Sequence, residues 1–269
     1  GDLYDAQLHE LAGTVSDPVE LFFQLAMDDI RAACDLMRPV FDGTGGVDGY
    51  VSLEVDPTLA YDREATFAQA MRFHSEIGRP NLYVKIPATQ IGLGAIEDCI
   101  AKGKSINVTL IFSLERYAAV AEAYIRGVER FVAAGGNPHA VSSVASFFVS
   151  RVDSEADGRL AEAGRTDLQG KLAVANAKLA YEHWRNVFSG ERWDYLAGKG
   201  ARPQRCLWAS TSTKNPDYRD VIYVEELAGP HTVNTMPMET VKAFQDHGEV
   251  RGATIGEGGA ATGATACTG

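Results

Sequence analysis

The sequence predicts an α/β fold of the TIM-type (β/α)8 class, incomplete, with about six βα units and its first two strands missing. Three observations support this prediction. Short segments in which apolar and polar residues alternate, as in β-strands, are separated by helical segments. Each connection is long enough for a parallel crossover. Polar residues recur on one strand face, whereas an open parallel sheet covered on both sides has continuously apolar strands. No GxGxxG motif follows a strand, which argues against a doubly wound dinucleotide-binding sheet.

The elements follow one another in a regular order. The predicted strands are residues 50–56, 82–89, 106–110, 141–146, 205–210 and 231–235. Asp17-Pro18 is a typical helix start, and this helix is expected to end at about Phe41. Further helices are predicted to begin at Asp62, Leu93, Ser113 and Pro237, and a helical hairpin to span about 154–188. The fourth strand is predicted to pass directly into a helix that contains Phe148 and Arg151.

The second predicted strand carries a lysine. Leu82, Val84 and Ile86 share one face, so Tyr83 and Lys85 share the other. A charged lysine is costly to bury inside a strand, and this cost lowers its pKa. The neutral amine that results is a nucleophile for a carbonyl group and can form a Schiff base. A lysine that reaches solvent from an edge strand is the alternative interpretation.

Polar side chains on the neighbouring strands favour the first interpretation. Glu54 lies on the same face of the first strand, and Asn107 and Thr109 on that of the third. In a barrel these side chains meet at the carboxyl ends of the strands, where barrel enzymes carry their chemistry. A carboxylate and a lysine that face one cavity shift each other's pKa, and a water between them can carry protons.

Composition excludes several classes of partner. The net charge is −11 and Lys and Arg do not cluster, so nucleic acid and anionic membranes are not expected partners. No apolar stretch is long enough for a membrane helix, and no secretory signal opens the chain. The four scattered cysteines predict reduced thiols in a cytoplasmic protein, with no disulfides and no metal site. These cysteines are Cys34, Cys99, Cys206 and Cys267.

Residues 1–252 are predicted to form one domain, because no linker-like segment divides them. Residues 253–269 end in a run of Gly, Ala and Thr without charge or large apolar groups. Such a run cannot bury enough surface to become ordered, so we expect a disordered or artefactual tail.

Five motifs in series resemble those of the transaldolases, specifically the actinobacterial type within the class I aldolase superfamily. They are residues 52–56, 84–89, 107–113, 146–153 and 208–216. The resemblance implies an enzyme of the pentose phosphate pathway without metal or organic cofactor. Such an enzyme moves a dihydroxyacetone unit from sedoheptulose 7-phosphate to glyceraldehyde 3-phosphate through a lysine Schiff base.

The resemblance also implies catalytic roles. Lys85 matches the Schiff-base lysine, Glu54 the carboxylate that relays protons through an ordered water, and Thr109 the hydroxyl that holds this water. A plain salt bridge is the alternative role for Glu54.

Substrate contacts follow from the same motifs. Asn107 and Ser146 match groups that bind the sugar hydroxyls, although each can instead be a buried polar group that bonds to backbone. Arg151 and Ser210 match contacts to phosphate. Lys214 stands where other branches of the family have an arginine, and a lysine cannot hold phosphate through two parallel bonds.

The family pattern begins with two further strands, one of which bears an aspartate acid/base, and neither has a counterpart in this sequence. We therefore expect an internal piece of a transaldolase that folds poorly or associates through open sheet edges and turns over slowly. Two other functions remain open at this stage: a fructose-6-phosphate aldolase-like activity, and a non-catalytic module that binds sugar phosphates. The sequence does not define the oligomeric state.

Overall fold

The structure is a computed structural model that describes residues 4–256. Its centre is a six-stranded parallel sheet in the order β1-β2-β3-β4-β5-β6. The strands are β1 (Val51–Glu54), β2 (Leu82–Pro87), β3 (Ile106–Ile111), β4 (Ser143–Phe148), β5 (Arg205–Ala209) and β6 (Thr232–Asn234). Each strand pairs with the next one in sequence, whereas a doubly wound sheet reverses its order at a switch point. The sequential order confirms the prediction of an incomplete TIM-type barrel.

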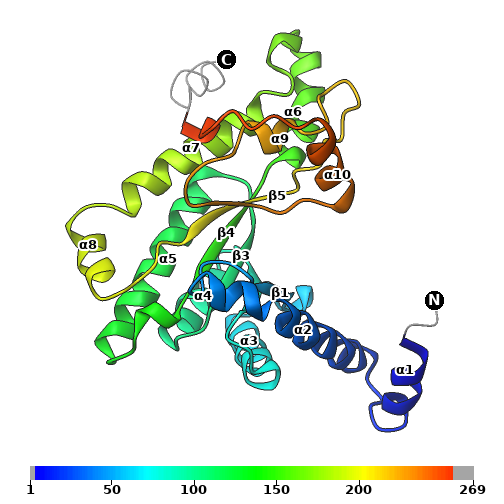
Figure 1. Ribbon diagram of the computed structural model, residues 1–269, viewed down its shortest axis with the longest axis vertical. Helices are drawn as coiled ribbons and strands as arrows, with labels where there is room; N and C mark the ends of the chain where they lie inside the picture. The colour runs from blue at the N-terminus through cyan, green and yellow to red at the C-terminus, as the bar shows by residue number, and fades with distance from the viewer. Residues whose placement is uncertain (1–3, 257–269) are drawn as a thin grey trace.

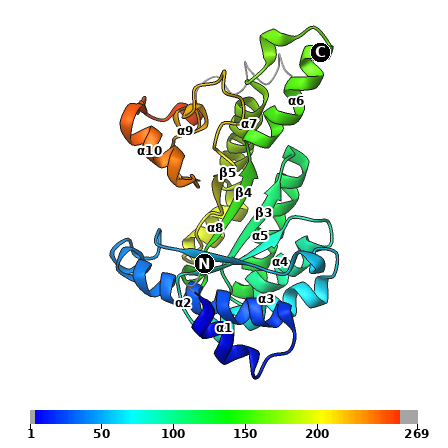
Figure 2. The same ribbon diagram turned by 90° about the vertical axis from the view of Figure 1, so that its right-hand side faces the viewer.

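Helices lie around this sheet (Figures 1 and 2). They are α1 (Asp5–Ala12), α2 (Pro18–Gly43), α3 (Arg63–Ile77), α4 (Gly92–Ala101), α5 (Leu114–Ala133), α6 (Ser150–Glu162), α7 (Leu172–Val187), α8 (Glu191–Gly198), α9 (Ile222–Glu225) and α10 (Met238–His247). In both views α1, α2 and α3 lie at one end of the molecule, and α6, α9 and α10 lie at the other. Helices α9 and α10 lie on the other side of the strands from α3, α4 and α5.

The predicted helix starts are confirmed by side-chain caps. Asp17 accepts a hydrogen bond from the backbone N–H of Val19, and Asp62 caps α3 in the same way. Ser113 caps α5. Each cap satisfies an N–H group that has no partner inside its helix. Helix α3 ends at Gly78, whose φ of 62° is a conformation that glycine adopts without steric cost.

Alternation along the strands divides the apolar residues into two cores. The larger core lies between the sheet and the helices and contains outward residues such as Val84, Ile106 and Val108, all fully buried. The smaller core occupies part of the inner face of the sheet. It consists of Tyr83, Val144, Phe148, Leu207 and Ala209, with Tyr50 and Val233 against them.

The fourth strand differs from its prediction. It runs from Ser143 to Phe148 instead of residues 141–146, so Phe148 belongs to the strand and the helix begins only at Ser150. The serines inside this strand weaken its apolar pattern. Strand β3 also contains a bulge that the sequence did not predict. Its register shifts between Val108 and Ile111, and Leu110 adopts a φ of 60°.

Part of the predicted tail packs against the domain. Thr254–Gly256 form a short 3-10 helix in which Thr254 and Ile255 are buried. The Ile255 N–H donates to the carbonyl of Ala228, and the Thr254 hydroxyl donates to the carbonyl of Glu225 at 2.6 Å. Residues 257–269 of the predicted tail lie outside the described residues.

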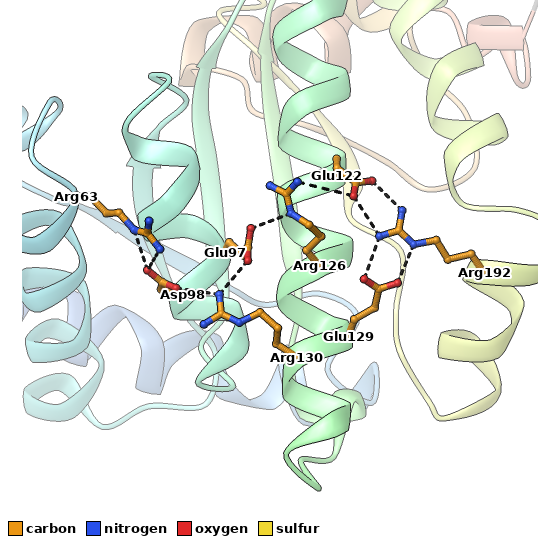
Figure 3. Close-up of polar contacts among 8 residues, drawn as sticks. All are labelled: Arg63, Glu97, Asp98, Glu122, Arg126, Glu129, Arg130 and Arg192. Carbon is orange, nitrogen blue, oxygen red and sulfur yellow. Dashed lines mark hydrogen bonds and ion pairs between the residues drawn. The ribbon is translucent and has the colours of Figure 1, made fainter.

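An ion-pair network ties four outer helices together (Figure 3). Arg192 on α8 contacts both Glu122 and Glu129 on α5, at 2.9 and 2.7 Å. The network continues through Arg126, Glu97, Arg130, Asp98 and Arg63 to α4 and α3. A single exposed ion pair contributes little to the stability of a protein. A guanidinium that two carboxylates share has better geometry than an isolated pair.

We predict that Arg192→Gln lowers the free energy of unfolding by about 1 kcal/mol, because α8 loses its ion pairs to α5. Chemical denaturation measures this loss, which should shrink in high salt. Arg165→Gln is the matched control, since Arg165 forms a local ion pair with Asp167, two residues away in sequence, at 3.0 Å. An equal loss in both variants would contradict a specific contribution of the network.

His74 on α3 is a partly buried histidine whose Nε2 lies 3.0 Å from the carbonyl oxygen of Ser105. Burial, and secondarily the nearby Lys104, lowers its pKa to about 4, against the opposing effect of the bond to Ser105. The unfolded chain therefore takes up this proton near pH 6.5, whereas the folded chain does so only near pH 4.

We predict that His74 makes the protein less stable as the pH falls from about 6.5 to 4, by about 3 kcal/mol at the lower end. His74→Gln should remove this share of the pH dependence, which denaturation curves at several pH values measure. His9→Gln on α1 is the control. Identical pH profiles for the wild type and His74→Gln would refute the assignment.

Candidate active site

The predicted nucleophile lies beside the predicted carboxylate. Glu54 and Lys85 are register partners on β1 and β2, and the Lys85 Nζ lies 3.2 Å from a carboxylate oxygen of Glu54. The Lys85 side chain is 28% exposed and that of Glu54 41% exposed. Lys85 is thus less buried than the strand pattern predicted. The pair forms the salt bridge that was the alternative role for Glu54, in a place that solvent and a small molecule can reach.

A line of hydrogen bonds crosses the inner face next to this pair. Asn107 on β3 is the register partner of Lys85 and is only 5% exposed. Its Nδ2 donates to the hydroxyl of Ser52 on β1 at 3.1 Å, and the Ser146 hydroxyl on β4 donates to its Oδ1 at 2.7 Å. These two bonds fix the orientation of the amide. Ser52 was not predicted as a site residue, although its place in the alternation of β1 pointed to it.

Thr109 lies two residues beyond Asn107 on β3 and is fully buried. Its hydroxyl oxygen has no hydrogen-bond partner among residues 4–256. A buried hydroxyl without a partner is costly, and a bound water is a common way to satisfy it. This geometry is compatible with the expected role in holding a water.

A second group of predicted residues lies where β4 and β5 end. The Arg151 guanidinium carbon lies 4.9 Å from the centre of the Phe148 ring, and this ring packs against Phe112. Ser210 has a φ of 55°, and its hydroxyl lies 2.8 Å from that of Ser150. The Ser150 N–H also donates to the Ser210 carbonyl. These bonds join the start of α6, which carries Arg151, to the end of β5.

Lys214 stands apart from the other predicted site residues. It is exposed in the loop after β5, and its ammonium group donates to the hydroxyl of Ser212 at 2.7 Å. Within residues 4–256 it makes no hydrogen bond or ion pair with any of the other predicted site residues. The nearby Thr211, in contrast, is buried and bonds to Asn234 on β6 at 2.8 Å.

The sequence analysis missed the residue that holds α6 in place. Asp153 is 1% exposed, and its carboxylate accepts hydrogen bonds from the Ala173 N–H at 2.8 Å and the Tyr223 hydroxyl at 2.7 Å. Burial raises the pKa of Asp153, despite these two bonds. The carboxylate links α6, α7 and α9, and so positions the helix that carries Arg151. The position of Asp153 at the end of the motif 146–153 could have identified it in the sequence.

The arrangement as a whole is that of a barrel enzyme. Polar groups gather at the carboxyl ends of parallel strands, and an amine lies among them beside an acid. Barrel enzymes place their catalytic residues at this end of the strands.

Comparison with known proteins identifies the family. The family model described as "Transaldolase/Fructose-6-phosphate aldolase" matches residues 1–266. A transaldolase of Frankia alni is 54% identical over 257 residues, which cover 94% of this chain and 69% of that protein. A transaldolase of Acidothermus cellulolyticus is 55% identical over 254 residues, 94% of this chain and 68% of its own length. The chain belongs to the transaldolase/fructose-6-phosphate aldolase family.

Two further observations concern membranes and metal ions. None of the helices in residues 4–256 combines the length and the apolar character needed to cross a membrane. The same residues contain no group of three or more His, Cys, Asp or Glu side chains placed to hold a metal ion.

Proposed function

We propose that this chain carries the transaldolase reaction, the transfer of a dihydroxyacetone unit from sedoheptulose 7-phosphate to glyceraldehyde 3-phosphate. The observation on which the proposal depends is the 3.2 Å distance between the Lys85 amine and a Glu54 carboxylate oxygen, near the carboxyl ends of β1 and β2. Membership of the family, together with the name transaldolase of the compared relatives, supports the same reaction.

Lys85 is the nucleophile in this proposal. Its deprotonated amine attacks the carbonyl carbon of the ketose, and a carbon–nitrogen bond forms. The carbonyl oxygen gains protons and leaves as water, which produces an iminium ion. The C3–C4 bond of the ketose then breaks as a base takes the proton of the C4 hydroxyl, and C4 leaves as the aldehyde of the shorter sugar phosphate. The electron pair of the broken bond moves into the iminium, and an enamine remains on Lys85. The enamine attacks the aldehyde of the acceptor, and water then hydrolyses the new imine.

Glu54 moves protons in these steps. It takes a proton from the lysine ammonium and returns one to the departing oxygen, directly or through a water held by Thr109. The separation of 3.2 Å is within reach of a direct transfer. Asn107 and Ser146 bind the sugar hydroxyls, and their mutual hydrogen bond at 2.7 Å presets the direction of the amide.

The phosphate groups are bound where β4 and β5 end. Arg151 supplies a planar guanidinium from the first turn of α6. Ser210 supplies a hydroxyl beside it, and Lys214 adds a positive charge from the exposed loop after β5. The amine supplies the electron sink, so the proposed reaction uses neither a metal nor an organic cofactor.

The family description also includes fructose-6-phosphate aldolase, which shares the Schiff base. An aldolase would release dihydroxyacetone without an acceptor, so product analysis with and without glyceraldehyde 3-phosphate separates the two activities. We also propose that the protein works in the cytoplasm, since Cys34, Cys99 and Cys206 are buried free thiols.

We predict that sodium borohydride with fructose 6-phosphate leaves a covalent adduct on Lys85, because reduction converts the imine into a stable amine. Mass spectrometry of peptides locates the adduct. Lys85→Met should abolish it, Glu54→Gln should slow its formation, and the control Lys102→Met should leave it unchanged. A folded sample without adduct that still binds fructose 6-phosphate saturably, also in Lys85→Met, would favour the non-catalytic sugar-phosphate-binding module. An adduct that survives Lys85→Met would contradict the assignment of Lys85 as the nucleophile.

We predict that Arg151→Gln raises the half-saturating concentration of fructose 6-phosphate in this trapping assay by about tenfold or more, because a charge-assisted bond to phosphate is lost. The rate at saturation should change less. Arg159→Gln is the control, since Arg159 lies on the same helix and pairs with Glu155 on the surface. If both variants raise the concentration equally, Arg151 is not a phosphate contact.

A further inference from the structure

A cavity of about 690 Å³ lies at the opposite end of the sheet from Lys85. Its walls include Tyr50, Leu82 and Ser105, which stand where β1, β2 and β3 begin. The catalytic groups Glu54 and Lys85 lie further along the same strands, toward their carboxyl ends. The cavity therefore belongs to the amino-terminal face of the barrel and is separate from the candidate active site.

Two cations in the wall of this cavity lack an acidic partner. No carboxylate of residues 4–256 lies within ion-pair distance of Lys104 or Arg202. The Arg202 guanidinium donates to the carbonyls of Gly45 and Gly46 and to the Nε2 of His139. These bonds hold the guanidinium in place without neutralising its charge.

The remaining charges in the wall cancel. Asp42 is the one acidic residue among the described lining residues, and it pairs with Arg38 at 2.8 Å. Arg79 pairs with Asp35 at 2.6 Å. His74 adds no charge at neutral pH, since its pKa lies near 4. The wall is thus cationic in a chain whose net charge is −11.

The cavity has the size and composition of a small-molecule site. Its volume falls within the roughly 300–1,000 Å³ typical of ligand pockets. Phe41 and Tyr50 supply an aromatic wall, with their ring centres 5.2 Å apart. Guanidinium and ammonium groups are the usual side-chain partners of phosphate. The single paired carboxylate makes a metal ion a poor match, and the concave shape makes a nucleic-acid duplex a poor match.

We propose that this cavity binds a small phosphate-bearing anion, with the phosphate between Lys104 and Arg202. A ligand there does not compete with a ketose for Lys85, because the two sites lie at opposite ends of the strands. The proposal is independent of the reaction at Lys85.

The test is isothermal titration calorimetry with inorganic pyrophosphate as the probe. Pyrophosphate can also reach the proposed phosphate contacts of the active site, so the Arg151→Gln/Lys214→Gln double variant serves as the background. In this background we expect one binding event, weakened about tenfold or more by Lys104→Glu or Lys104→Gln. Circular dichroism confirms that each variant is folded.

Lys102→Glu is the matched control for charge. Lys102 is exposed, lies two residues from Lys104 and does not line the cavity, so its reversal should change the affinity less than about twofold. Three results would overturn the proposal: no binding in the double-variant background, equal binding with and without Lys104→Glu, or an equal loss in Lys102→Glu. Borohydride trapping on Lys85 is measured separately, so its failure leaves this test intact.

Discussion

The parallel register between β1 and β2 is the constraint on which the candidate active site depends. It makes Glu54 the partner of Lys85, and the next register makes Asn107 the partner of Lys85 on the other side. A shift of one residue in either strand would turn its polar residues toward the helices and its apolar residues inward. The apolar outer residues, fully buried at Val84 and Ile106, oppose such a shift. The same packing that forms the core thus sets the spacing of the amine and the acid.

Much of this could be predicted from the sequence, because strand alternation has a period of two and is local. The pattern of β2 alone placed Lys85 on the inner face, and the caps of α2, α3 and α5 marked their starts. Contacts between distant segments carried no such signal. Asp153 bonds to Tyr223, which lies 70 residues further along the chain, and no local pattern indicates this pairing. The bulge at Leu110 was equally hidden, since a leucine rarely adopts a positive φ.

The exposure of Lys85 shows a related limit of sequence reasoning. A position inside an apolar strand predicts burial of the whole residue, yet the side chain is 28% exposed while its strand neighbours Val84 and Ile86 are fully buried. Burial depends on which face a side chain occupies and on what covers this face. The register neighbours of Lys85 on the inner face are the polar residues Glu54 and Asn107, whereas Phe148 and Leu207 belong to a small apolar core on this face. The amine is therefore accessible while the rest of its strand stabilises the fold.

Two stacked tyrosine rings lie in the interior, between the cavity and the candidate active site. Tyr83 lies between Leu82 and Lys85 on β2 and faces the interior, where its ring stacks on Tyr50 at 4.0 Å. Its hydroxyl lies 2.6 Å from that of Ser142, so the ring is fixed at both its face and its tip. Leu82 and Lys85 are three residues apart, which corresponds to about 10 Å along an extended strand. The stacked rings of Tyr83 and Tyr50 thus lie along the strands between Leu82 in the cavity wall and Lys85 in the candidate active site.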